Sequence, residues 1–517
     1  MKSKPVLPLI VILLMLTSSG NDGTDRFIHI WGNLLWSLSP ITVDHNGNIY
    51  LSGEFEDTVY FGSWDNWLVN LDSSDYFIIK YYPDGTVAWK KVVTGMGSEQ
   101  LYDMKVDDEG FVFLTGQYDQ AMLMDDLYLD IGMDSEHYLC KLDPDGNLVA
   151  MKRGSEDGED LIINRIDLDD SGRIYVSGRA PGDRVFGHPI DSATRRTIGG
   201  DAGFLAQLGS DFTANWVITV CDSAGLSYTD GCFCTAIAVD PDNHLYAAGY
   251  ADSSPFSYTF ISKISQDGQL LWMDTIPMQQ SMGILDVFIN EEQDVYMITG
   301  SNPDIQFNFP VVTSGDAILA KYTKEGEYIW SKGFSPNWWT YVVTREGYTV
   351  ASYYTEWYKP DGLMIIDPEG EIVYDHLFDS IEFHSLVIDE QGNVFYNGSF
   401  SEEISLGNDV FSPQAGNNYV FGQLKVEEML SGSYAALIKK QDPYPLYPNP
   451  ANGEINFSLS EGERVLQLEI FDLSGKLLHH GTGAEVPVNL ERFKDGIYMV
   501  RLRTSKRIII DKIVINK

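Results

Sequence analysis

The sequence has 517 residues, which is room for more than one domain. Its hydrophobic content of 44% and charged content of 21% are those of a folded globular protein, so a disordered chain and a fibre are excluded. The 75 acidic residues against 35 basic ones give a net charge of −40. Such a protein repels phosphate backbones and anionic membrane surfaces, which excludes nucleic acid as a bulk partner.

Residues 1–20 have the order of a secretory signal peptide. Lys2 and Lys4 precede an apolar run from Val6 to Leu16, and small polar residues follow as far as Gly20. The run is well short of the ~20 apolar residues that a spanning helix needs. We therefore expect export, cleavage after Gly20, and a mature chain with no transmembrane segment.

A strand-and-turn motif then recurs along the chain. It reads Asp, a short turn, Gly or Asn, and alternating apolar residues that end near a Gly, as in Val43 to Gly53. The clear copies begin at Asp44, Asp107, Asp169, Asp240 and Asp389, and weaker copies begin at Asn290 and Thr344. Repetition of a strand-rich unit is typical of a closed or stacked array rather than of one sandwich.

A second motif falls between these copies. It is an alternating apolar run that leads to an acidic-Gly pair and then often to a Trp, as in Asp267-Gly268 followed by Trp272. The acidic-Gly pairs predict hairpin turns of type I′, and the period-2 alternation predicts strands with one buried face. Each unit thus supplies about four short strands, the content of a propeller blade.

Residues 25–440 are therefore predicted to form an all-β, seven-bladed β-propeller, with six or eight blades as alternatives because two copies are weak. The segment Gly32 to Trp36 copies the end of the second motif ahead of the first full unit, whereas the last unit lacks a turn with Trp. We expect this N-terminal strand to complete the last blade and close the ring, which removes both edges. An open β-solenoid is the alternative architecture.

The repeat resembles that of bacterial β-propeller proteins of the SBBP type over Asp25 to Lys440. The resemblance is carried by Asp-x-x-Gly-Asn-x-Tyr, by the Phe-Gly steps at Phe61 and Phe186, and by Gly-x-x-x-Trp. It implies an extracellular propeller, and it implies architecture more than activity.

A Pro-rich linker at residues 441–446 separates a compositionally different tail at residues 447–517. From Tyr444 onward there are ten Lys/Arg and nine Asp/Glu, so the preceding 443 residues carry a net charge of −41. About six short strands predict a small Ig-like β-sandwich.

The tail closely resembles the type A C-terminal sorting domain of the type IX secretion system of Bacteroidota. The resemblance rests on Tyr-Pro-Asn-Pro, Phe-Asp-Leu-Ser-Gly-Lys, Gly-Ile-Tyr-x-Val and a terminal Lys-Ile-Val-Ile-x-Lys, in that order. It implies the type IX machinery as a partner and a secreted or outer-membrane surface-attached protein. The residues that match the sorting pattern are Tyr447, Pro448, Asn449, Pro450, Gly453, Asp472, Gly475, Lys476, Gly496, Tyr498 and Lys512.

The four cysteines predict a local disulfide and no metal centre. We expect Cys221 to pair with Cys232 or Cys234, and Cys140 to remain a buried thiol. Asp167-x-Asp169-x-Ser171-Gly172 matches half of a calcium loop, but Gly178 stands where the closing Glu belongs. We therefore expect Asp169 to cap its own turn and no cofactor to be bound, with calcium as the weaker alternative.

No local catalytic signature is present: the sequence has no His-Glu-x-x-His, no Gly-x-Ser-x-Gly and no phosphate loop. This favours a non-catalytic module that binds an extracellular glycan or protein. A glycoside hydrolase or lyase with its site in the propeller channel and a structural or adhesive surface component are the alternatives. Three aromatic clusters are candidates for stacking on sugars: Trp64/Trp67, Trp338/Trp339 and Tyr353/Tyr354/Trp357. Converging acids with a His, Tyr or Arg at the channel would favour the enzyme.

Overall fold

A computed structural model provides the fold. It describes residues 28–34, 40–70, 75–95, 97, 99–154, 161–180, 184–185, 188–189, 202–223, 231–252, 257–278, 284–300, 317–334, 338–353, 362–378, 381–389, 392–406, 409–424, 426–430, 446–447, 454–457, 465–471, 476–482, 488–490, 492–494, 496–504 and 508–515.

The described chain up to residue 424 can be divided into seven groups of four antiparallel strands, called units here. Four units are separate four-stranded sheets, and the other three are joined in one 13-stranded sheet through the pairing of β6 with β8 and of β1 with β3. The described chain is all-β apart from two short helices, α1 (Val220–Ser223) and α2 (Val426–Leu430). Unit 1 contains β2 (Ile41–Val43), β3 (Ile49–Phe61), β5 (Asp75–Tyr81) and β6 (Val87–Gly95). Unit 2 contains β7 (Glu99–Val106), β8 (Val112–Met124), β9 (Leu127–Leu142) and β10 (Leu148–Arg153). Unit 3 contains β11 (Ile162–Leu168), β12 (Ile174–Ala180), β15 (Ala202–Leu208) and β16 (Ala214–Thr219). Unit 4 contains β17 (Gly231–Val239), β18 (Leu245–Asp252), β19 (Ser257–Ile264) and β20 (Leu270–Met278). Unit 5 contains β21 (Ile284–Ile289), β22 (Val295–Gly300), β23 (Ala317–Tyr322) and β24 (Tyr328–Phe334). Unit 6 contains β25 (Trp338–Val343), β26 (Thr349–Tyr353), β27 (Gly362–Ile366) and β28 (Ile372–Leu377).

Unit 7 joins the two ends of the array. Its strands are β29 (Glu382–Ile388), β30 (Val394–Ser399), β33 (Asn417–Leu424) and, from the opposite end of this region, β1 (Ile28–Leu34). Strand β1 pairs with β33 from Ile28 opposite Phe421 to Gly32 opposite Asn417. The prediction that an N-terminal strand completes the last unit is confirmed, while Trp36, which suggested it, lies outside the described residues.

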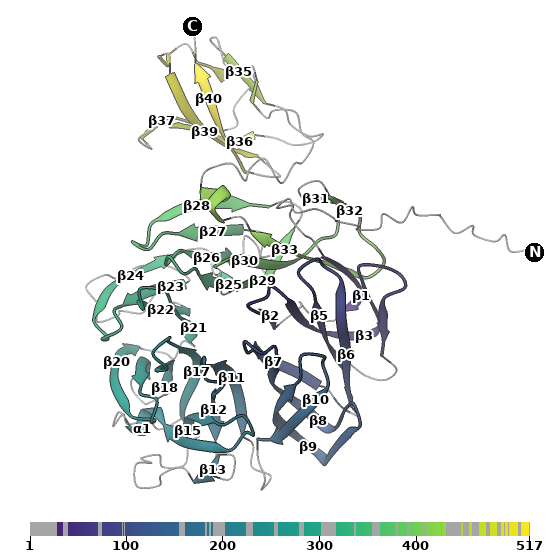
Figure 1. Ribbon diagram of the computed structural model, residues 1–517. Coiled ribbons are helices and arrows are strands. Elements are labelled where there is room, and N and C mark those ends of the chain that lie inside the picture. Colours follow the sequence, from purple (N-terminus) through teal and green to yellow (C-terminus); the bar gives the residue numbers. More distant parts are fainter. Residues whose placement is uncertain are drawn as a thin grey trace, which may run out of the picture.

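The units surround a common centre, as Figure 1 shows. The innermost strand of each unit contacts that of a neighbouring unit, and β2 contacts both β7 and β29, so the ring is continuous. Hydrophobic clusters fill the spaces between units; one of them joins β11 and β12 of unit 3 to Phe113 and Leu139 of unit 2. This propeller-like arrangement packs neighbouring sheets face to face, which explains why strands such as β5 and β23 are buried along their whole length, whereas the outer strand β28 is largely exposed.

The two sequence motifs occupy the two hairpins of each unit. The Asp motif forms the turn between the first and second strands, where Gly47 donates its N–H to the carbonyl of Asp44. The acidic-Gly motif forms the turn between the third and fourth strands, where Gly268 donates to the carbonyl of Ser265. Neither β1 nor β33 has such a turn, because the fourth strand of unit 7 comes from the N-terminal side.

The predicted type I′ geometry of the acidic-Gly turns is wrong. A type I′ turn needs positive φ at both central residues. Here only the Gly is positive, as at Gly268 (φ 79°), and Asp267 is not. A shift of register follows within the same hairpin, between Lys263 and Ile264. The hairpins are therefore type I turns closed by a left-handed residue, the three-residue arrangement that places a bulge next to the turn.

Short hairpins are present in addition to the four strands of each unit. They are β4 (Trp67–Val69), which pairs with the end of β3, the pair β13 (Arg184–Val185) and β14 (His188–Pro189), and the pair β31 (Ile404–Leu406) and β32 (Asp409–Phe411). No helix in the described part of the chain is long and apolar enough to cross a membrane.

The C-terminal region forms two further sheets. One contains β34 (Leu446–Tyr447), β35 (Glu454–Phe457) and β38 (Val488–Asn489), and the other has the order β37 (Leu477–Thr482), β36 (Val465–Phe471), β39 (Gly496–Thr504) and β40 (Ile508–Ile515). Leu468, Leu490, Val500 and Ile513 are buried in a shared core. This region thus has a hydrophobic core of its own, as expected for a separate module.

Candidate functional site

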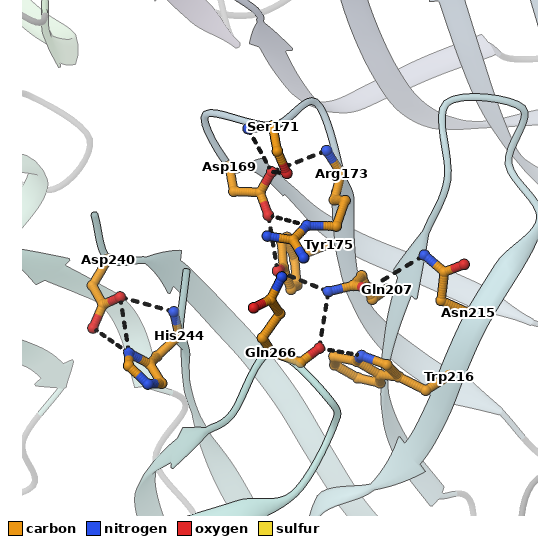
Figure 2. Close-up of polar contacts among 10 residues, drawn as sticks. All are labelled: Asp169, Ser171, Arg173, Tyr175, Gln207, Asn215, Trp216, Asp240, His244 and Gln266. Atoms are coloured by element: carbon orange, nitrogen blue, oxygen red, sulfur yellow. Dashed lines mark hydrogen bonds and ion pairs between the residues drawn. The ribbon is translucent and has the colours of Figure 1, made fainter. Parts of the chain in front are cut away.

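The Asp of the inner turn is occupied by hydrogen bonds within its own unit. In Figure 2, Asp169 accepts bonds from the N–H and hydroxyl of Ser171, from the N–H and Nε of Arg173, and from the hydroxyl of Tyr175. Asp44 makes the same bond to Tyr50 in unit 1, at 3.1 Å. These carboxylates are 8% and 3% exposed, and their hydrogen bonds compensate for the loss of water.

Asp169 therefore caps its own turn, as expected from the sequence. The neighbouring Asp167, which the half calcium loop grouped with it, lies on β11 and makes different contacts. Its Oδ1 is 3.2 Å from the Nζ of Lys105, and its Oδ2 accepts a bond from the N–H of Val239. The two carboxylates thus serve different partners.

A second group of potential metal ligands lies in the turn of unit 4. Ligand atoms of Asp240, Asp242 and His244 lie within 4.8 Å of one another. The Asp240 carboxylate already contacts Nδ1 of His244 at 3.2 Å and Nζ of Lys263 at 3.1 Å, and Figure 2 shows the contact with His244. The ion pair and the turn account for this arrangement in the way that Arg173 and the turn account for Asp169.

The Trp of the second motif connects one unit to the next. The indole Nε1 of Trp272 in unit 4 donates to the carbonyl of Lys324 in unit 5, at 3.1 Å. The same bond recurs from Trp89 to Pro144, Trp216 to Gln266 (drawn in Figure 2) and Trp330 to Pro368. Each acceptor lies in the acidic-Gly turn of the following unit, so we call this contact the indole latch.

The latch also explains the Gly of the motif. A Cβ built on Gly326 would lie 2.6 Å from the ring of Trp272, and one on Gly268 would lie 2.9 Å from the ring of Trp216. The Gly is therefore required by the indole of the preceding unit as well as by its own positive φ. Sequence reasoning found both residues but missed the contact, because the partners lie in different units.

A charged group gathers at the centre of the ring. Asp103 and Lys105 from β7, Arg165 from β11, Asp286 from β21 and Tyr341 from β25 influence one another electrostatically, although they come from units 2, 3, 5 and 6. They were not singled out from the sequence. A signal was present, because each lies among the alternating residues shortly before an inner turn, but such positions are common in the repeats.

The central charges shift one another's pKa values. Burial raises the pKa of Asp103 and of Asp286, and the neighbouring cations offset part of the effect. The Asp167 carboxylate raises the pKa of Lys105. Burial raises the pKa of Tyr341 well above its ordinary value, and the charge of Asp286 adds to this.

Two acids at the centre, Asp103 and the Asp167 that pairs with Lys105, join neighbouring units. Oδ2 of Asp103 accepts a bond from the N–H of Ile166 in unit 3, as Asp167 of unit 3 does from Val239 of unit 4. In unit 6 the hydroxyl of Thr340 accepts from the N–H of Leu386 in unit 7. Acids with Arg and Tyr thus converge at the centre, the arrangement expected of an enzyme, but two of the acids also hold inner strands together.

The structure separates the three aromatic clusters. Trp338 and Tyr353 are 4% and 5% exposed and belong to the hydrophobic core. Tyr354 and Trp357 lie outside the described residues, and the side chain of Trp339 is not described. Trp64 and Trp67, in contrast, are 50% and 49% exposed at the β3–β4 hairpin. Of the three aromatic clusters, only this one presents rings to solvent within the described part of the chain.

A groove of about 400 Å³ lies at the outer junction of units 1 and 2. Lys90 of β6 lines it, and its Nζ also donates to Oδ1 of Asn66 and to the carbonyl of Trp67. Its other walls include Thr94, Asp125 and Asn147. The groove is therefore largely polar and lies between β6 and the outer turns of unit 2, and no residue of the β3–β4 hairpin lines it.

The predicted local disulfide is confirmed. Cys221 is bonded to Cys232, which selects one of the two expected partners, while Cys140 and Cys234 are buried thiols. Burial raises the pKa of Cys140 above its ordinary range and that of Cys234 to about 12. Both thiols are thus protonated and unreactive at neutral pH.

The sorting-pattern residues are only partly within the described chain. Tyr447 lies on β34, Gly496 and Tyr498 on β39, and Lys512 on β40, where it pairs with Met499. The Tyr498 hydroxyl donates to the carbonyl of Lys494 at 2.9 Å, and Lys476 is exposed. The remaining residues, Pro448, Asn449, Pro450, Gly453, Asp472 and Gly475, lie outside it.

Comparison with known proteins identifies the C-terminal region. Residues 445–516 match the family of secretion system C-terminal sorting domains, so the chain carries a type IX sorting domain, which implies export. No curated protein sequence matches the chain.

Three solved structures similar to the chain were compared. The Dos1 propeller has 9% identity and a TM-score of 0.44, covering 77% of this chain and 95% of its own. Puromycin hydrolase has 12% identity and a TM-score of 0.42, covering 74% of this chain and 54% of its own. Sqt1 from Chaetomium thermophilum has 10% identity and a TM-score of 0.39, covering 92% and 96%.

Proposed function

We propose that this chain is an exported surface or secreted protein whose ring of β-sheets binds an extracellular partner without catalysis. Its C-terminal domain delivers it through the type IX secretion machinery. The match of residues 445–516 to the sorting-domain family carries the proposal. The signal-like residues 1–20 agree with it, because their pattern also predicts export.

In this proposal the ring is a seven-bladed β-propeller of the SBBP type from a member of the Bacteroidota. Seven four-stranded units, the pairing of β1 with β33 and the contacts of β2 with β7 and β29 support this blade count. The tail is an Ig-like sandwich made of its two small sheets. Its recognition residues are the sorting-pattern set from Tyr447 to Lys512 named above.

Binding is favoured over catalysis by the way in which the central acids are used. Asp103 and Asp167 each accept a backbone N–H from the next unit, and Asp167 also pairs with Lys105. An acid held by the backbone and a cation has a structural task already. The second candidate, a glycoside hydrolase or lyase, draws its support from Asp286, Arg165 and Tyr341 at the same centre.

Fractionation of a type IX-competent host tests the export step. The full chain is compared with a chain ending at Pro443 and with a foreign exported protein fused to Tyr444–Lys517. We expect the full chain and the fusion at the surface or in the medium, and a folded truncated chain in the periplasm. Surface delivery of the truncated chain would contradict the sorting role.

The second candidate is tested separately. Asp286→Asn and Tyr341→Phe would each abolish turnover of a polysaccharide if the centre were catalytic. Under the binding proposal the full chain leaves a panel of polysaccharides uncleaved, and product formation that both variants abolish would replace the proposal by the enzyme.

A further inference from the structure

We propose that the β3–β4 hairpin, with the exposed rings of Trp64 and Trp67, is the binding site of a neutral polysaccharide. The inference rests on the proposed binding function and specifies its ligand class and its place on the ring. The hairpin lies at the junction of units 7 and 1, where β1 pairs with both β33 and β3.

The hairpin displays a row of aromatic rings across three strands. Trp31 of β1 is opposite Tyr60 of β3, and Tyr60 is opposite Trp67 of β4, so the three side chains share one face. The Trp31 and Tyr60 rings are stacked with centroids 5.5 Å apart. Exposure increases along the row, from 4% for Trp31 to 49% for Trp67. The row thus runs from a buried ring to an exposed one.

Trp64 is held in place from beneath. Its ring meets Tyr60 edge-on at 4.7 Å and Trp31 edge-on at 5.4 Å, yet half of its surface remains exposed. An indole fixed by two aromatic contacts loses little side-chain entropy when a ligand binds. The hairpin therefore presents one preorganised indole, Trp64, and a second exposed indole, Trp67, to solvent, which is a costly arrangement unless something covers them.

Hydrogen-bonding groups lie between and beside the two rings. Asp65 separates Trp64 from Asn66 in the turn and is fully exposed, and a hydrogen bond from Ser63 lowers its pKa. Its ionised carboxylate can accept bonds from two neighbouring hydroxyls. The ammonium group of Lys90, which donates to Oδ1 of Asn66 and to the carbonyl of Trp67, is a further polar group at the hairpin.

This combination matches a sugar polymer. The C–H groups of a pyranose form an apolar face that can lie on an indole ring, while the hydroxyls at its edge need polar partners such as Asp65. A chain of several sugars can cover both exposed rings of the hairpin. The net charge of −40 repels sulfated and uronic acid polymers, so we assign a neutral polysaccharide.

Binding by the purified full chain tests this site. The probes are soluble neutral polysaccharides of glucose, xylose, mannose and galactose, measured by affinity electrophoresis and calorimetry. We expect at least one to bind, and Trp64→Ala and Trp67→Ala each to weaken that binding about tenfold or more. Tyr128→Ala is the matched control, because Tyr128 is a 54% exposed aromatic residue on β9 outside the row, and it should bind normally.

Variants that keep a ring guard against loss of folding. Trp64→Phe and Trp67→Phe should bind within about threefold of the native chain, since a smaller ring still stacks. Equal binding by native chain and both alanine variants would overturn the site while leaving the proposed binding function intact. Absence of binding to every neutral polymer, with capture of a protein or an acidic glycan instead, would overturn the ligand class. Export is measured separately, so its failure leaves these outcomes unchanged.

Discussion

Two regions of the ring use tryptophan in opposite ways. At the repeated junctions the indole of Trp272, like those of its counterparts, is half-buried against the turn of the next unit and donates to a backbone carbonyl. At the junction of units 7 and 1, Trp64 and Trp67 lie on an added hairpin and expose about half of their surface. The seam also differs in its connection, because β1 replaces a contiguous fourth strand in unit 7. Tryptophan recurs in the repeats for a structural reason. A tryptophan outside the repeated motif, such as Trp64, is therefore the better candidate for a functional residue.

The largest effect should come from removing the seam strand. Deletion of residues 26–37 removes β1 and leaves unpaired edges on β33 and on the end of β3. It also removes the buried Ile28, Ile30 and Trp31. We expect the melting temperature to fall by about 10 °C or more. Calorimetry checks this against a chain that lacks only residues 1–25, and equal melting would show that the ring closes elsewhere.

A pH effect should appear at the junction of units 1 and 2. Glu99, which is fully buried, has a pKa raised to about 8, chiefly by burial and then by the neighbouring Asp75. The folded chain retains this proton where the unfolded chain releases it. Stability should therefore be highest below about pH 4.5 for this group and fall by on the order of 4 kcal/mol as the pH rises to 8.

Glu99→Gln isolates that effect, because the amide keeps the neutral shape and cannot ionise. Urea unfolding from pH 5 to pH 9 should show a flatter pH dependence for the variant, which becomes the more stable chain at the alkaline end. Parallel curves for the two chains would mean that Glu99 is already ionised in the fold.

A smaller loss should follow from blocking one indole latch. Gly326→Ala places a Cβ 2.6 Å from the Trp272 ring at a φ of +86°, so we expect a loss of about 3 kcal/mol. Gly172→Ala is the control, because Gly172 has a φ of +75° with no atom within 4 Å of the added Cβ. That variant should lose only about 1 kcal/mol. Equal losses measured by urea unfolding would remove the role of the latch.

The repeats made much of the fold predictable. Periodicity located the inner turns at Asp44 and its equivalents, and the stray copy at Gly32 revealed the closing strand, because both are local patterns. Contacts between units were not predictable, since the acceptor of Trp272 lies 52 residues away and the charged and phenolic side chains at the centre come from four units. The solvent exposure of the tryptophan side chains was equally unpredictable from the sequence. Trp64 and Trp338 look alike in sequence, and only the packing around them separates a surface ring from a core ring.

The smallest effect should distinguish the two kinds of tryptophan most directly. Trp272→Ala removes an indole that fills the space against Gly326 and its bond to Lys324, so it should cost about 2 kcal/mol. Trp64→Ala removes a ring that only rests edge-on upon Trp31 and Tyr60, and should cost about 0.5 kcal/mol. Urea unfolding of the two variants at one pH measures both values. A tryptophan that serves binding contributes little to the stability of the fold, whereas a tryptophan of the indole latch contributes only to that stability. A loss at Trp64 as large as that at Trp272 would make the hairpin a structural clasp of the seam, and its exposed rings would then need no ligand to explain them.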